Sequence, residues 1–118
     1  MNLFQPVLDG VLHFDCKEIR KSPENERRNI GECILASLDG FLGEDGGGAK
    51  LVPQHEVVYG LRIAAEYGGN NGRILEKVTE IAQRYNSGIC DRGNHINGVH
   101  LFDNNKRVGY HRIPNQEM

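Results

Sequence analysis

The sequence lacks the features that mark several large classes of protein. Its longest apolar runs are only a few residues, such as 57–59, whereas a membrane-spanning helix needs roughly 20. Its first fourteen residues contain Asp9 and no basic segment, so they do not resemble a secretory signal. Its three cysteines are odd in number and far apart, which predicts neither a disulfide framework nor a paired-cysteine motif. We therefore expect a cytoplasmic protein with reduced thiols and no contact with a membrane.

A strong excess of either charge is also absent. The net charge is −2, which argues against a protein that mainly coats nucleic acid. The charge is uneven, because residues 1–83 carry nine Lys or Arg and thirteen Asp or Glu, whereas residues 84–112 carry five and two. The basic segment also holds three of the five histidines, at His95, His100 and His111. This carboxyl-terminal third is therefore where we look for a site.

The length and the apolar periodicity predict one globular domain over residues 1–118. Helix signals occur three times, over 23–42, 53–67 and 71–85, each with apolar residues at helical spacing and a glycine or asparagine near its end. The glycine-rich segment 43–50 is expected to be a flexible loop, and residues 114–118 a loose tail.

Strand signals lie at both ends of the chain. At the amino end, apolar residues flank Asp9-Gly10, which suits a tight turn, although residues 4–14 are also compatible with a single strand. At the carboxyl end, two alternating runs flank Asn104-Asn105, and asparagine tolerates the positive φ of a hairpin turn. We expect an α+β fold of order β(β)-α-α-α-β-β: a single two-layer domain with one small antiparallel sheet, made of the N-terminal strand or strands and the C-terminal hairpin, packed against three helices.

The hairpin suggests a candidate site. If Asn104-Asn105 is the turn, Phe102 faces Arg107, His100 faces Gly109 and Gly98 faces His111. Val99, Leu101, Val108 and Tyr110 would then form the core side, and His100, His111, Phe102 and Arg107 the opposite face. Two imidazoles about 7–8 Å apart beside an arginine are suited to acid and base catalysis on a phosphodiester. A register slip of one residue would separate them.

The cysteines offer weaker hypotheses. Cys90, His95 and His100 form a C-x4-H-x4-H array, but no second cysteine lies close, so we expect no metal site and no cofactor. Cys90 as a nucleophile would need one of these histidines as its base. Cys33 sits among apolar helix residues, which predicts core packing.

The function that these features favour is a small non-catalytic protein-binding module, such as an inhibitor, immunity-type or adaptor protein, acting through the hairpin face and the sheet edge. Its partner would be another protein or a second copy of the chain. The expected binding residues are Phe102, Arg92, His95, Arg107 and Arg112. The alternative is a metal-independent ribonuclease-like protein, or a binder of nucleotides or another phosphorylated small molecule, in which His100, His111 and Arg107 handle the phosphate of RNA or the ligand. Whether the protein is an enzyme stays open.

Overall fold

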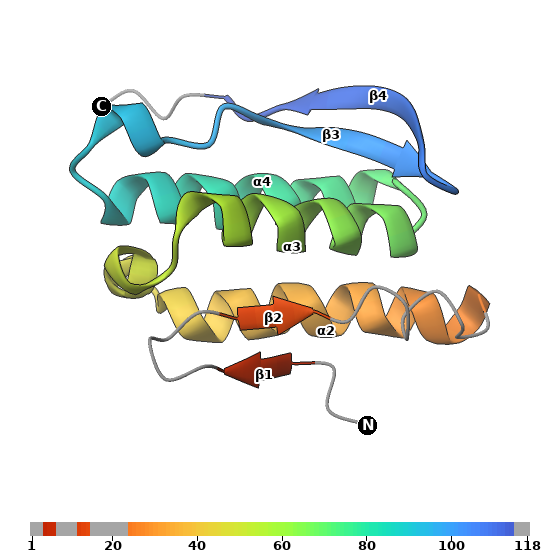
Figure 1. Ribbon diagram of the computed structural model, residues 1–118, viewed down its shortest axis with the longest axis horizontal. Helices are drawn as coiled ribbons and strands as arrows, with labels where there is room; N and C mark the ends of the chain where they lie inside the picture. The colour runs from red at the N-terminus through yellow and green to blue at the C-terminus, as the bar shows by residue number, and fades with distance from the viewer. Residues whose placement is uncertain (1–3, 7–11, 15–23, 115–118) are drawn as a thin grey trace.

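The computed structural model describes residues 4–6, 12–14 and 24–114 (Figure 1). Its elements, in chain order, are β1 (Phe4–Pro6), β2 (Leu12–Phe14), α2 (Glu24–Leu42), the 3-10 helix η1 (Gly47–Leu51), α3 (Gln54–Tyr67), α4 (Gly72–Gly88), the 3-10 helix η2 (Arg92–Asn94), β3 (Gly98–Asp103) and β4 (Lys106–Arg112). The predicted α+β class and the order of helices before the C-terminal hairpin are confirmed.

The strands form two separate antiparallel sheets of two strands each, β1-β2 and β3-β4, where we expected a single sheet. The helices keep these sheets apart. As Figure 1 shows, β3 and β4 lie over α3 and α4, and α2 lies on the far side of those two helices with β2 in front of it. The expected turn at Asp9-Gly10 lies outside the described residues, as does most of the expected tail.

Helix α2 buries one face against α3 and α4. Ile30, Ile34, Leu38 and Leu42 recur at four-residue spacing and are all less than a tenth exposed. The helix ends where predicted, because Gly43 adopts a φ of 76° that ordinary side chains rarely adopt. Cys33 is exposed, so its predicted place in the core is wrong: it lies one position outside the buried stripe.

Helices α3 and α4 form an antiparallel pair joined by a short turn (Figure 1). Gly69 and Asn70 adopt positive φ in this turn, and the Asn71 side chain caps α4 by accepting a hydrogen bond from the Ile74 N–H at 3.0 Å. The apolar stripe predicted for α4 is buried at Ile74, Val78, Ile81, Ala82 and Tyr85. The pair therefore forms a platform for the C-terminal hairpin.

The glycine-rich segment folds as a turn followed by η1, and it contributes Ala49 to the core. Gly46 lies directly against the carbonyl oxygen of Arg84, and Gly88 lies against the carbonyl oxygen of Gly46, so the two backbones meet with no room for a side chain between them. Nearby, the buried Tyr85 hydroxyl donates to the Val52 carbonyl at 3.3 Å.

A side-chain bridge joins α4 to the start of the hairpin. The amide of Asn86 donates to the Ile96 carbonyl at 3.0 Å and accepts from the Ile96 N–H at 2.6 Å. Asparagine thus satisfies both main-chain groups of Ile96, as a neighbouring strand would. Ile96, Val99 and Ile113 are buried with the helices, and these three side chains attach the hairpin to the core.

Candidate functional site

The hairpin register departs from the simple alternation expected from the sequence. The turn is as predicted, because Asn104 and Asn105 both adopt positive φ, of 48° and 67°. Phe102 pairs with Arg107 as predicted, but Leu101 pairs with Gly109, so Val108 is an extra residue in a β-bulge. Beyond this bulge every pair in the hairpin is shifted by one residue.

The shift places the two hairpin histidines on opposite faces. His100 pairs with Tyr110, whereas His111 pairs with Val99, which is 1% exposed and faces the helices. The prediction that His100 and His111 share a face is therefore wrong. Because residues on opposite faces cannot approach one phosphate group together, the structure provides no support for the catalytic pair of His100 and His111 assisted by Arg107.

His111 fastens β4 to α4. Its Nε2 lies 2.6 Å from the Thr79 hydroxyl, and that hydroxyl donates its own hydrogen to the Leu75 carbonyl at 2.9 Å. A hydroxyl has a single hydrogen to give, so Thr79 accepts from an Nε2–H of His111. This histidine therefore has a structural partner on the inner face.

His100 belongs to what we call the outer face of the hairpin, which consists of His100, Arg107, Tyr110 and Arg112. Arg107 donates through Nε to His100 Nδ1 at 3.0 Å, and the ring centroids of His100 and Tyr110 are 5.1 Å apart. The Tyr110 ring also covers Gly98, where any Cβ would collide with it. An aromatic ring, an imidazole and two guanidinium groups thus share one surface.

Two side chains expected in the core lie outside it. Val108 is 57% exposed and Tyr110 is 50% exposed, and both displacements follow from the bulge. Sequence reasoning did not identify Val108 as a surface residue. For the position of the Tyr110 ring a weak signal was present in Gly98, because a glycine in a strand often marks the close approach of another group.

The residues predicted to bind a partner do not all gather on this face. Arg107 and Arg112 belong to it, and both are exposed. Arg92 lies in η2, and His95 follows it, with its carbonyl accepting from the Gln54 amide at 2.8 Å. Phe102 is half-buried, with its ring 4.6 Å from the guanidinium carbon of Arg62 on α3.

Phe102 instead takes part in a clamp between β3 and α3, which the sequence did not reveal. Arg62 contacts the rings of Phe102 and Tyr59, and its Nη1 lies 3.8 Å from a Glu66 carboxylate oxygen. The Glu66 side chain is only 6% exposed. Asn70 completes the clamp, because its amide donates to the Phe102 carbonyl at 3.3 Å.

The cysteine and histidine array does not assemble. Over residues 4–6, 12–14 and 24–114, no three His, Cys, Asp or Glu side chains lie close enough together to hold a metal ion. Cys90 precedes η2, His95 follows it, and His100 points to the outer face of the hairpin.

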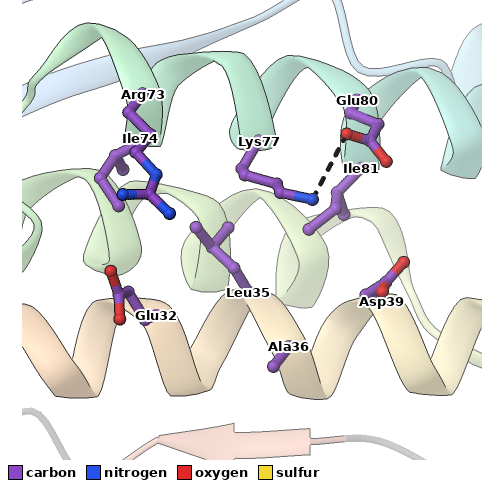
Figure 2. A pocket seen from close by; sticks show the side chains of 9 residues that line it. All are labelled: Glu32, Leu35, Ala36, Asp39, Arg73, Ile74, Lys77, Glu80 and Ile81. Carbon is purple, nitrogen blue, oxygen red and sulfur yellow. Dashed lines mark ion pairs between the residues drawn. The ribbon is translucent and has the colours of Figure 1, made fainter.

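A separate groove of about 270 Å³ runs between α2 and α4 (Figure 2). Leu35, Ile74 and Ile81 form its apolar floor. Charged side chains of both signs line it, namely Glu32, Asp39, Arg73, Lys77 and Glu80, and Lys77 lies 3.7 Å from Glu80. Because these charges largely neutralise one another, the groove has no clear preference for a ligand of one sign.

Comparisons with models of protein families, with curated proteins and with solved structures find no match to this chain. No helix in the part of the chain that the structure describes is both long enough and apolar enough to cross a bilayer. Any functional conclusion therefore depends on the residues and the geometry of this structure.

Proposed function

We propose that this protein is a small binding module that docks a partner protein through the outer face of the hairpin and the adjacent edge of β4. The observation that carries the proposal is the exposure of Tyr110 beside Arg107 and Arg112, on a hairpin whose other face is fixed to the helices. Tyrosine and arginine are the side chains most enriched at energetically dominant positions of protein interfaces.

The outer face is also held in place before any partner arrives. Tyr110 is packed over Gly98 and beside His100, and Arg107 is held by its hydrogen bond to His100. A side chain that is already ordered loses less conformational entropy on binding. Val108, exposed at the bulge, adds apolar area next to these groups. The face therefore combines anchor residues with preorganisation, as an inhibitor, immunity-type or adaptor protein requires.

The proposal leaves the partner open between another protein and a second copy of this chain. We place the protein in the cytoplasm, because three cysteines without a pairing pattern suit a reducing compartment. The phosphodiester alternative lacks its basis, since the imidazole pair on which it depended is divided between two faces of the hairpin.

The test begins with the proteins retained by the wild-type chain from an extract of its source cells. Each is identified, produced separately and measured against the purified chain. Tyr110→Ala is expected to raise the Kd of the true partner at least tenfold, a loss of about 1.4 kcal/mol that is typical of an interface anchor.

The matched control is Leu51→Ala, which removes an exposed apolar side chain (62% exposed) from η1 rather than from the hairpin. Its Kd is expected to stay within twofold of the wild-type value. The proposal fails if no retained protein binds the purified chain, or if Leu51→Ala weakens binding and Tyr110→Ala does not.

A further inference from the structure

The outer edge of β4 is an open sheet edge. β4 pairs with β3 alone among the strands that the structure describes, and all seven of its residues are exposed or half-buried. The opposite edge, on β3, is partly covered, because β3 lies along α3 and the Asn70 amide donates to the Phe102 carbonyl. A strand with free N–H and C=O groups is a template for a further strand.

The charge of β4 restricts what that further strand can be. β4 contains Lys106, Arg107, His111 and Arg112 and no carboxylate. The one carboxylate in the hairpin strands, Asp103, belongs to β3, where it lies opposite Lys106 in the register at the turn. An incoming strand would therefore meet an almost wholly cationic edge.

This charge pattern disfavours a second copy of the chain as the partner. Pairing of two β4 strands would bring Lys106, Arg107 and Arg112 of one copy close to the same three cations of the other copy, with no carboxylate on either strand to offset them. Like charges brought close together repel each other.

A hollow beside β4 indicates what a further strand, added at the edge of β4, would contact with its inner face. It has a volume of about 410 Å³ and lies between α4 and β4, and no residue of α3 or β3 lines it. The hollow is lined by Gly72, Leu75, Glu76, Thr79, Glu80 and Gln83 of α4 and by His111. Apolar side chains suit this hollow, whereas carboxylates would be repelled by the two glutamates.

From these observations we infer that β4 binds an acidic extended segment of a partner protein as a third, antiparallel or parallel, strand of the hairpin sheet. The inference rests on the proposed function and specifies its partner. Side chains alternate between the two faces of a strand. Acidic residues would therefore lie on the outer face, beside Arg107, Tyr110 and Arg112, and apolar residues would alternate with them and point into the hollow.

Three synthetic peptides test the inference on the full-length chain: one alternating Glu and Val over seven residues, one alternating Lys and Val, and one with the same glutamates but with proline in place of valine. Binding is followed by backbone amide NMR shifts and by amide hydrogen exchange in β4. The Glu-Val peptide is expected to bind at least tenfold more tightly than either other peptide and to slow exchange of β4 amides at least tenfold.

Charge reversal provides the matched variants. Arg107→Glu combined with Arg112→Glu is expected to invert the preference, so that the Lys-Val peptide binds more tightly than the Glu-Val peptide. Arg73→Glu combined with Lys77→Glu, an equal change of charge in the groove between α2 and α4, is expected to keep the original order.

Several outcomes would overturn the inference. Equal binding of the proline peptide would mean docking on the face without strand addition, and the proposed function would survive. Three further results would each exclude the acidic strand. They are tighter binding of a single-stranded oligonucleotide than of the Glu-Val peptide, protection of the β4 amides by self-association, and no binding of the Glu-Val peptide. The proposed function is judged separately, by the effect of Tyr110→Ala on a purified partner.

Discussion

Strands β3 and β4 belong to one hairpin, yet their surroundings differ. β3 inserts Val99 into the core, carries the Phe102 ring that Arg62 covers, and receives a hydrogen bond from Asn70. β4 is paired with β3, and within β4 His111 contacts Thr79 of α4. One strand thus secures the hairpin while the other leaves its side chains and its edge available. Stability and binding are therefore divided between neighbouring strands, and each can be altered without the other.

The largest expected difference in the free energy of unfolding is between two valine-to-alanine substitutions, one in β3 and one in β4. Val99→Ala should lower the free energy of unfolding by about 2 kcal/mol, because it removes buried methyl groups and leaves a cavity. Val108→Ala should change it by less than about 0.5 kcal/mol, since this side chain is largely exposed. Urea unfolding of the two variants measures both values. Similar losses would show that Val108 is packed and that the bulge is misplaced.

The next largest loss in the free energy of unfolding is expected when the clamp between β3 and α3 is broken. Arg62→Ala removes the contacts with two aromatic rings and leaves the buried Glu66 carboxylate without its cation, at an expected cost of about 1.5 kcal/mol. Chemical denaturation measures this loss. Adding Glu66→Gln should recover part of it, because the unpaired charge is then gone. If Glu66→Gln recovers none of the loss, the contacts of Arg62 with the aromatic rings account for the whole effect.

The hydrogen bond between His111 of β4 and Thr79 of α4 should contribute about 1 kcal/mol to the free energy of unfolding, the usual net value of one hydrogen bond. Thr79→Val keeps the shape of the side chain and removes the hydroxyl that accepts from His111. A double-mutant cycle with His111→Ala should show a coupling of similar size. Additive losses would contradict a direct bond between the two residues.

The smallest expected change in the free energy of unfolding comes from Tyr85, in the helix pair that supports β3. Burial raises the pKa of Tyr85 above its ordinary value of 10.0. Above pH about 10 the unfolded chain loses this proton before the folded chain does, so the free energy of unfolding falls as the pH rises. Tyr85→Phe should cost less than about 1 kcal/mol near neutral pH, through loss of the bond to Val52.

Because the variant lacks this ionisation, the difference between wild type and Tyr85→Phe should shrink between pH 10 and 11. Denaturation curves at three pH values are sufficient to measure the change. A difference that grows with pH would reverse the sign of the argument and indicate that the phenol ionises more readily when folded.

The helices were predictable because their signals are local. The apolar stripe of α4, its Asn71 cap and the glycine after α2 each act within a few residues, and the observed bounds agree closely with the expected ones. The same is true of the Asn104-Asn105 turn and of the first pairs of the hairpin next to it.

The site was not predictable in the same way. The run from Val108 to His111 alternates equally well in two registers, so nothing within β4 specifies where a residue is left unpaired. Contacts distant in sequence favour the observed register: His111 with Thr79, and the Tyr110 ring over Gly98. Val108, the one unpaired residue of the bulge, is enough to move the side chains that follow it to the opposite face of the hairpin and so to separate His111 from His100.

The meeting of Gly46 and Gly88 has a practical consequence for anyone who modifies this protein. By composition, the segment around Gly46 resembles a spacer into which a tag or a label might be placed. Its backbone in fact fills the space beside the end of α4, so even one methyl group there would force the two segments apart. Gly40, where an added Cβ meets nothing within 4 Å, is a position for a fluorophore or an affinity handle.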